Sequence, residues 1–235
     1  MDDNYNYNGY PIFAAPGLHE SAIKVICETI RPGATILDLG CGSGSMTQRL
    51  IDNGYNVFSA DIDLSKFNLK TESMIVDLNS EFSDLFKSRK FAGIVALEVI
   101  EHLENPLHFL RHLKELMDKD TIAYISFPNI YMYLCVRSFL KDASFIEWNP
   151  EQYWETGHQT VLTDWLFEQH LSKIGLSIES KEFVALLDMT KIHKKNFKIQ
   201  INKIFLNLLC FLNRTVTRNM RTSNCVLYGV YSRNK

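Results

Sequence analysis

The chain has 235 residues and a formal net charge of −2 at pH 7. Hydrophobic residues make up 46% and charged residues 22%, the balance of an ordinary globular protein with a packed core. The small negative charge argues against nucleic acid as a partner. Five scattered cysteines without a Cys-x-x-Cys pair argue against a structural zinc site and for a reducing compartment. The N-terminus is acidic and tyrosine-rich, unlike a secretion signal, and no apolar run of about 18 residues follows, so we expect a cytoplasmic protein.

Hydrophobic periodicity and turn residues predict alternating helices and strands along most of the chain. Residues 1–18 predict an N-terminal arm or cap, and residues 130–160 are aromatic and irregular. The expected helices cover 19–30, 45–53, 106–117 and 163–174, and the expected strands cover 34–39, 56–60, 73–76, 91–97, 121–127, 176–184 and 225–232. Strands that alternate with helices are typical of a doubly wound α/β fold, whose ligands bind at the carboxyl ends of the strands.

The segment 187–221 interrupts this alternation and is rich in Lys and Arg around an apolar helical pattern at 197–212. We expect a single domain over 1–235, with this segment as a helical insertion before the last strand. Two interpretations stay open. The inserted helix could pack on the sheet with a solvated basic face, or it could form a lid or a surface for an anionic substrate or a lipid headgroup. The second interpretation allows membrane contact through 197–212.

The run Ile36–Ser45 is the most informative part of the chain, because an apolar strand ends in an acid and opens into three glycines before a helix. Glycines at such a turn let a ligand approach main-chain N–H groups directly. The run resembles motif I of the class I S-adenosylmethionine-dependent methyltransferases. The resemblance implies S-adenosylmethionine as cofactor and a Rossmann-like sheet of seven mostly parallel strands with the last strand antiparallel. It implies donor contacts from the loop residues Gly40, Cys41, Gly42 and Gly44, with Asp38 orienting the loop.

Acids at the ends of the next two expected strands extend the predicted donor site. Asp61 follows Gly40 by about 20 residues, the spacing at which an acid accepts hydrogen bonds from ribose hydroxyls. The alternative role for Asp61 is to cap the following segment. The resemblance implies the same ribose contact for Asp61, beside Ile62, and an adenine contact for Asp77 and Leu78. A P-loop is excluded because no Gly-Lys-Ser/Thr follows the glycines. The spacing of the glycines departs from the Gly-x-Gly-x-x-Gly fingerprint, which makes nicotinamide binding less favoured than methyl-donor binding.

The run Glu98–Leu103 places two carboxylates and an imidazole at the end of the expected strand 91–97. Such a set suits Mg²⁺ or Mn²⁺. The run resembles two metal-using branches of the superfamily, the quinone-biosynthesis O-methyltransferases and the small-RNA 3′-end 2′-O-methyltransferases. The resemblance implies Glu98, Glu101 and His102 as metal ligands, His158 as a looser fourth ligand, and Glu98 beside the donor. Two alternatives stay open: Glu101, His102 and His158 act as general acid or base without a metal, or the motif is only structural.

Two features of the sequence bear on the methyl acceptor. The chain lacks the Asn/Asp-Pro-Pro-Tyr/Phe motif common in amino-group methyltransferases, which favours oxygen as the methyl acceptor. Many aromatic residues lie in segments expected near the site: Tyr5, Tyr7, Tyr10, Tyr131, Tyr133, Trp148, Tyr153, Trp154 and Trp165. Together with their polar neighbours they suit a small polar acceptor, although they could equally be the packed rim of a lid.

A general likeness to stand-alone bacterial methyltransferases favours a sugar or nucleotide-linked precursor of a surface glycan as this acceptor. A quinone-type or RNA 3′-end O-methyltransferase is the alternative among enzymes. A regulatory protein that binds S-adenosylmethionine without catalysis is the alternative outside enzymes. His19 precedes the first expected helix and could also reach the site.

Overall fold

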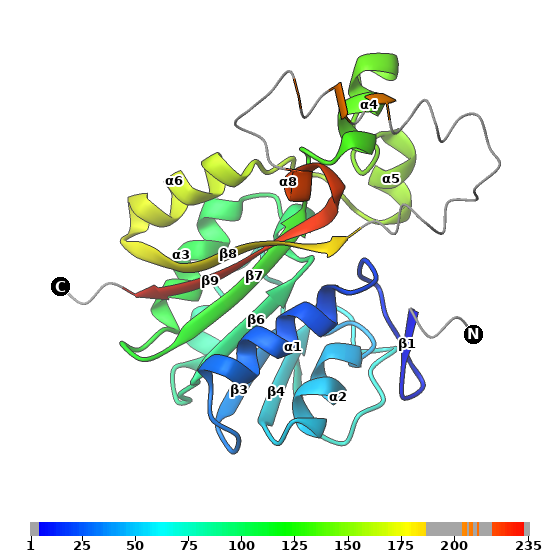
Figure 1. Cartoon of the computed structure of the whole chain (residues 1–235). Helices are drawn as coiled ribbons and strands as arrows, with labels where there is room; N and C mark the ends of the chain where they lie inside the picture. The colour runs from blue at the N-terminus through cyan, green and yellow to red at the C-terminus, as the bar shows by residue number, and fades with distance from the viewer. Residues whose placement is uncertain (1–4, 187–203, 206, 209–210, 212–217, 233–235) are drawn as a thin grey trace.

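The computed structural model describes residues 5–186, 204–205, 207–208, 211 and 218–232 (Figure 1). The predicted basic insertion 187–221 lies outside the described residues for most of its length. The helices are α1 (Leu18–Thr29), α2 (Ser45–Asp52), α3 (Pro106–Glu115), α4 (Tyr133–Asp142), α5 (Pro150–Glu155), α6 (Asp164–Ile174) and α8 (Arg218–Thr222), with the short 3-10 helices η2 (Ser83–Phe86) and η3 (Ile100–His102). None of the helices in this described part is long and apolar enough to cross a lipid bilayer.

The strands form a hairpin and one large sheet. Their bounds are β1 (Asn6–Tyr7), β2 (Tyr10–Pro11), β3 (Thr35–Leu39), β4 (Asn56–Asp61), β5 (Glu72–Ile75), β6 (Gly93–Leu97), β7 (Ile122–Pro128), β8 (Leu176–Leu186) and β9 (Ser223–Ser232). The 7-stranded sheet has the order β5-β4-β3-β6-β7-β9-β8. Pairing is parallel from β5 to β7, and β9 is antiparallel to both of its neighbours. The predicted doubly wound, mostly parallel sheet with an antiparallel last strand is confirmed.

The position of the site follows from the strand order. The order reverses between β3 and β6, so the chain leaves these two adjacent strands toward opposite sides of the sheet. Ligands of doubly wound sheets bind at this switch point, outside the carboxyl ends of the strands. The glycine-rich loop after β3 and the acidic motif after β6 both lie at this edge.

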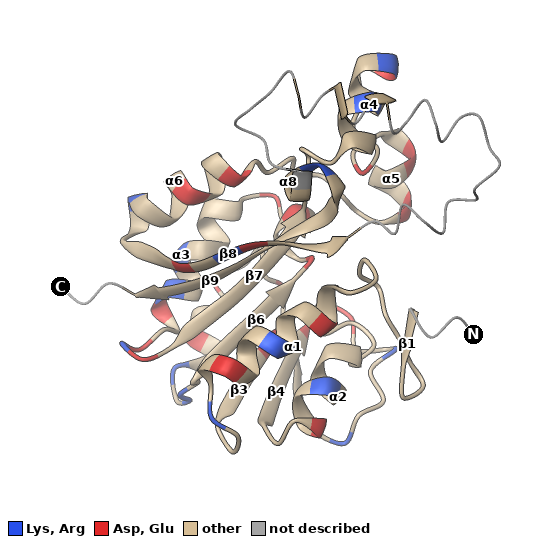
Figure 2. Cartoon of the chain, viewed as in Figure 1, with Lys and Arg blue, Asp and Glu red and all other residues tan. Residues whose placement is uncertain are grey.

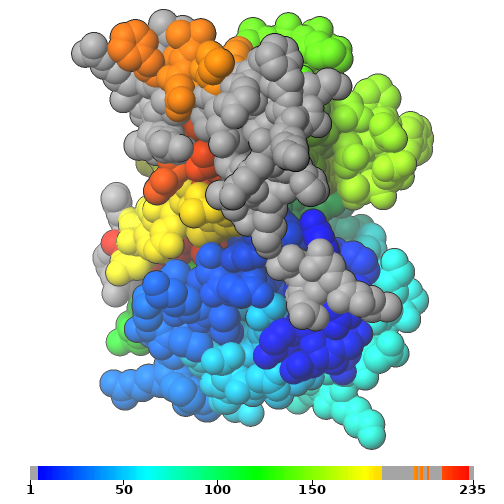
Figure 3. All heavy atoms as spheres, turned by 45° about the vertical axis from the view of Figure 1, so that its right-hand side comes forward, coloured from blue at the N-terminus to red at the C-terminus, as the bar shows by residue number. Residues whose placement is uncertain are grey.

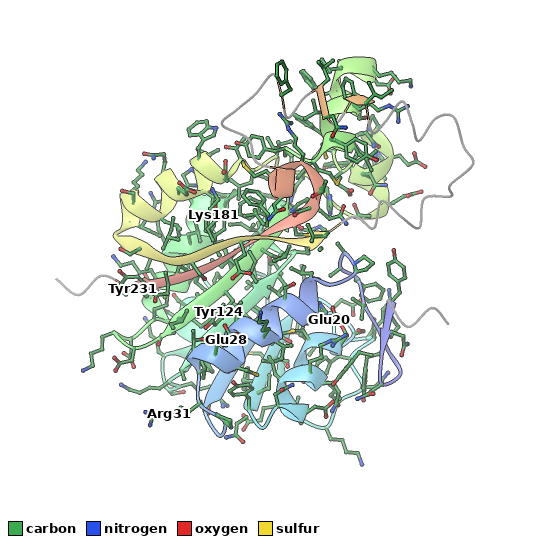
Figure 4. All side chains as sticks on the ribbon, in the orientation of Figure 1. Glu20, Glu28, Arg31, Tyr124, Lys181 and Tyr231 are labelled. Carbon is green, nitrogen blue, oxygen red and sulfur yellow. The ribbon has the colours of Figure 1, made fainter. Side chains whose placement is uncertain are left out.

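Helices bury both faces of the sheet, with α1 and α2 on one side and α3 and α6 on the other (Figure 1). Strand β6 is buried along its whole length, which explains its unbroken apolar sequence. Aromatic rings fill the face under α6, where the Phe167 ring lies 5.1 Å from Phe127 and 4.8 Å from Tyr228, centroid to centroid. On the other face Tyr124 extends from β7 toward α1 and its hydroxyl contacts that of Thr29 (Figure 4).

The prediction that 130–160 is irregular is wrong for two stretches, α4 and α5. The side chain of Asn149 accepts hydrogen bonds from the N–H groups of Glu151 and Gln152, each at 3.0 Å, and Pro150 occupies the first turn of α5. Asn before Pro is a recognised helix start. Helix α5 has only 6 residues, however, which is too few to show an apolar period.

The N-terminal hairpin β1–β2 packs against α2 and the loop before it. The Tyr7 hydroxyl donates to Asp52 at 2.8 Å, and the Arg49 guanidinium lies 3.9 Å from the centre of the Tyr7 ring. The Ser43 hydroxyl donates to the Pro11 carbonyl at 2.5 Å. Figure 3 shows the dark-blue N-terminal residues on the surface of the lower half of the molecule.

Candidate active site

The loop between β3 and α2 is bent by glycines with positive φ, 72° at Gly40, 52° at Gly42 and 88° at Gly44. A residue with a side chain adopts this left-handed conformation at a cost of about 1–2 kcal/mol. At Gly40 space is limiting as well, because a Cβ atom would collide with Cγ2 of Val99. The loop needs glycine at this position both for its bend and for its close approach to the segment after β6.

Two carboxylates fix the loop to the ends of β3 and β4. Asp61 Oδ2 accepts a hydrogen bond from the Gly42 N–H at 2.8 Å, and Asp38 Oδ2 accepts one from the Thr47 hydroxyl at 2.6 Å. Burial raises the pKa of Asp38 to about 6, the Thr47 hydrogen bond opposes the shift, and the charge of Asp61 adds to it. The loop is therefore held in one shape before any ligand binds.

Glu98 follows β6 with a φ of 53°, which is uncommon for a residue with a side chain. The Ser126 hydroxyl donates to Glu98 Oε1 at 2.7 Å, and the Cys225 thiol donates to Oε2 at 3.3 Å. Burial raises the pKa of Glu98 to about 7, against the effect of these two hydrogen bonds. Glu98 is consequently a carboxyl group that gains or loses its proton near neutral pH.

Glu101, His102 and His158 form a cluster beside Glu98. One ligand atom from each residue lies within 4.8 Å of the other two. His158 Nδ1 is 2.9 Å from the carbonyl oxygen of Glu147. Because a carbonyl oxygen only accepts hydrogen bonds, Nδ1 carries the proton and the neutral ring has its lone pair on Nε2. Residues far apart in the sequence thus present two imidazole rings and one carboxyl group to the same point.

The carboxyl group of Glu101 is the unusual member of this cluster. Both of its oxygens are buried and have no hydrogen-bond partner among the residues that the structure describes. Burial raises the pKa of Glu101 well above its usual range, and the charge of Glu98 adds to the shift. Burial also lowers the pKa of His102, and His158 acts in the same direction. Without a cation nearby, the cluster favours a protonated carboxyl group and neutral rings.

A cavity of about 760 Å³ connects the glycine loop to this cluster. One wall consists of Asp38, the loop residues 40–43 and the arm residues 12–16. Another part of the wall is formed by Glu98, His102, Pro128, Glu147, Glu155, Thr156, His158, Asn224 and Cys225. Cavities of about 300–1,000 Å³ hold small-molecule ligands in most proteins. We call these two parts of the wall the loop side and the acidic side.

His19 on α1 also lines the cavity, with 6% of its surface exposed. Its Nδ1 atom is buried and lacks a hydrogen-bond partner among the described residues. Burial lowers the pKa of His19 to about 4, and the charge of Arg49 adds to the shift, so the ring is neutral at pH 7. An unpaired buried nitrogen at a cavity wall is a group that a ligand can satisfy.

Residues 15–181 match the family model described as a methyltransferase domain. The chain belongs to this family. The resemblance of the run Ile36–Ser45 to the class I S-adenosylmethionine-dependent methyltransferases is thereby confirmed.

Curated relatives of this methyltransferase-family chain carry the name ubiquinone biosynthesis O-methyltransferase. The relative from Rickettsia canadensis (strain McKiel) is 28% identical over 188 residues, which are 76% of this chain and 75% of the relative. The relative from Rickettsia typhi is 32% identical over 102 residues, 40% of this chain and 41% of the relative. The chain thus matches less than half the length of the second relative.

Solved structures show the same fold at low sequence identity. A S-adenosylmethionine-dependent methyltransferase from Archaeoglobus fulgidus has a TM-score of 0.61 and 16% identity, over 92% of this chain and 93% of that one. The magnesium protoporphyrin IX methyltransferase of Synechocystis, with S-adenosylhomocysteine bound, has a TM-score of 0.57 and 17% identity, over 92% and 82%. At these identities the similarity supports the fold alone.

The loop side of the cavity fits the methyl donor of the family. Glycines at its wall expose main chain directly, and His19 offers an unpaired nitrogen. Five of the predicted donor contacts line the cavity: Asp38, Gly40, Cys41, Gly42 and Glu98.

The structure places the other predicted donor contacts away from the cavity wall. Asp61 has its carboxylate engaged by the N–H groups of Gly42 and Asp63, and Asp77 accepts from the Asn79 N–H of its own turn. Three more residues predicted to contact the donor also do not line the cavity: Gly44, Ile62 and Leu78. Ile62 is 65% exposed, and Leu78 is buried in the core. Ribose and adenine contacts from Asp61, Ile62, Asp77 and Leu78 stay predictions.

The predicted metal ligands need one correction. The structure brings Glu101, His102 and His158 together as predicted but does not include Glu98 in the cluster. The Glu98 carboxylate is turned toward Ser126 and Cys225, which occupy its two oxygens. Glu98 has a left-handed backbone (φ 53°) directly after β6, whereas Glu101 lies in η3.

The predicted aromatic acceptor pocket is also corrected. Of the nine aromatic residues named above, the cavity wall within the described chain includes Tyr5. Trp154 is 83% exposed and Trp165 is 59% exposed, while Trp148 packs beside His158 from outside the cavity. The sequence analysis missed Glu147 and Asn224, because neither lies in a recognisable pattern.

Proposed function

We propose that the chain transfers the methyl group of S-adenosylmethionine to a hydroxyl oxygen, with the help of a divalent metal ion. The observation that carries the proposal is the cluster of Glu101, His102 and His158 on the cavity that also holds the glycine loop. The name O-methyltransferase of the curated relatives supports oxygen as the acceptor atom. A sugar, a quinone precursor and an RNA 3′ end are narrower possibilities within this proposal.

S-adenosylmethionine carries its methyl group on a sulfonium, so the reaction needs mainly alignment of donor and acceptor and exclusion of water. The glycine loop positions the donor, since its glycines leave room for close contact with the backbone. The N-terminal arm covers the loop through the hydrogen bond from Ser43 to Pro11, which excludes solvent from that side. His19 remains neutral and can pair with a polar atom of the ligand.

The cluster fits Mg²⁺ or Mn²⁺ because it combines unpaired carboxylate oxygens with two imidazole nitrogens. Held by Glu101, His102 and His158, such an ion would lower the pKa of an acceptor hydroxyl and would favour a diol over a single hydroxyl group. The Glu147 carbonyl keeps His158 in the tautomer that directs Nε2 to the cluster. Glu98 lines the same cavity and has a pKa of about 7, so it is the proposed acceptor of the hydroxyl proton once its hydrogen bonds to Ser126 and Cys225 rearrange. An acceptor with adjacent hydroxyl groups suits this arrangement.

The test is methyl transfer to catechol, measured by mass spectrometry of the product with Mn²⁺ present. We expect Glu101→Gln to reduce the rate by at least about 100-fold, because the substitution removes a carboxylate ligand. Glu104→Gln is the matched control, since Glu104 is exposed in the same loop, and should retain the rate. Equal rates in the unmodified chain, Glu101→Gln and Glu104→Gln would contradict metal assistance. A rate that a metal chelator leaves unchanged would contradict it as well. Binding of S-adenosylhomocysteine without turnover on any diol would support the regulatory alternative.

A further inference from the structure

The acidic side of the cavity concentrates carboxylates around the cluster. Glu98, Glu147 and Glu155 line it, and buried Glu101 lies directly behind. Within the described part of the chain, Lys66 is the only Lys or Arg on the cavity wall. Its Nζ atom lies 5.2 Å from the ring centre of Phe13, on the N-terminal arm, and so belongs to the loop side.

Glu147 is fixed next to the cluster by its backbone, because its carbonyl oxygen accepts the His158 Nδ1 proton at 2.9 Å. Glu147 is also one of the residues that line the cavity, beside His158. Neither its carboxylate nor that of Glu155 is required by the metal cluster or by the donor. Both are therefore available to an acceptor molecule.

Glu155 ends α5 and is exposed at the rim of the cavity. Helix α5 carries acidic residues and no Lys or Arg (Figure 2). Thr156 and His158 follow Glu155 along the cavity wall. Glu155 and Glu147 thus line the same cavity as His102 and His158 of the cluster.

We propose that Glu147 and Glu155 determine acceptor specificity by charge. They favour a diol that carries a cationic or uncharged group and reject one that carries a phosphate or carboxylate. The inference rests on the proposed function, since it concerns the acceptor of that same site. Like charges brought together at a partly buried site weaken binding by roughly tenfold or more. Nucleotide-linked sugars and RNA ends carry phosphates, so both are disfavoured as acceptors.

The experiment uses three catechols with an aminomethyl, a hydroxymethyl or a carboxymethyl group at the same ring position. Each is titrated into the full chain saturated with S-adenosylhomocysteine and Mn²⁺, and the dissociation constant is measured by calorimetry. The shared diol makes the contribution of the metal the same for all three probes. The double variant Glu147→Gln/Glu155→Gln removes both carboxylate charges. Because the same three probes are titrated into both proteins, a change in their relative affinities reports the effect of these charges. Glu151→Gln on the same helix is the matched control, and thermal unfolding confirms that each variant is folded.

We expect the amine to bind most tightly and the carboxylate at least about tenfold more weakly than the alcohol. In the double variant this difference should fall below about threefold, while Glu151→Gln should retain it. Equal binding of all three probes to the unmodified chain overturns this inference alone. Retention of the full difference in the folded double variant also overturns it. Failure of every probe to bind overturns the proposed function, and this inference with it.

Discussion

At the scale of single residues, Glu98 and Glu101 show how one motif separates two roles. Glu98 has both carboxylate oxygens hydrogen-bonded and a pKa near 7. Both Glu101 oxygens are buried and lack a hydrogen-bond partner among the described residues, and Oε1 lies 3.9 Å from His102 Nε2. Unpaired buried carboxylate oxygens are costly unless a cation or a proton compensates them. This difference is why the proposed function places a metal ion at Glu101 and proton transfer at Glu98.

Gly40 gives a prediction at this scale. Gly40→Ala adds a left-handed backbone strain and a collision with Val99, so we expect a loss of about 2–4 kcal/mol in the free energy of unfolding. Binding of S-adenosylhomocysteine should be lost as well. Gly33→Ala is the matched control, since its φ is 85° but nothing lies within 4 Å of the added Cβ. The control should lose about 1–2 kcal/mol and retain binding. Similar losses in both variants would contradict the close approach at Gly40.

At the scale of elements, the N-terminal hairpin packs against α2 and the glycine loop, and we expect it to retain the donor. Two contacts hold it to α2, the Tyr7 hydrogen bond to Asp52 and the stacking of Arg49 on the Tyr7 ring. Neither contact lies on the cavity wall. They can therefore be removed without changing a residue that touches the ligand.

Tyr7→Ala should increase the dissociation rate of S-adenosylhomocysteine by roughly tenfold, because a hydrogen bond and a cation–π contact are lost together. Tyr7→Phe keeps the ring and should show a smaller increase. Stopped-flow dissociation measures both rates. Tyr153→Ala removes an exposed tyrosine of α5 that is not on the cavity wall, and serves as the control. An unchanged rate in Tyr7→Ala would show that the hairpin does not retain the ligand.

The elements also show what the sequence could predict. The strands of the large sheet could be predicted from apolar runs bounded by turn residues. The glycine loop could be predicted from the order of strand, glycines and helix. Helix α5 was missed because six residues are too few for a period, although Asn149 and Pro150 mark its start. Glu147 and Asn224 reach the cavity only through long-range packing, which no local pattern encodes.

At the scale of the whole molecule, the reversal of strand order between β3 and β6 brings the glycine loop and the acidic motif to the same edge of the sheet. The donor loop follows one of these strands and the acidic motif follows the other. Elsewhere the fold is held by ordinary interactions. An example is Lys181 on β8, which lies under α6 and binds Asp164 at 2.6 Å and Glu168 at 2.8 Å (Figure 4). The chemistry is concentrated at one edge of the sheet.

The central claim is that Glu101, His102 and His158 hold a divalent cation beside the donor. Calorimetric titration of Mn²⁺ into the chain saturated with S-adenosylhomocysteine tests it most directly. Because the pKa of Glu101 is raised, protons compete with the metal at higher pH than for an ordinary carboxylate. We predict one site that binds more weakly at pH 6 than at pH 8, is lost in Glu101→Gln and is kept in Glu104→Gln. Absence of binding at both pH values, or equal binding in Glu101→Gln, would contradict the claim and leave His102 and His158 as a general base.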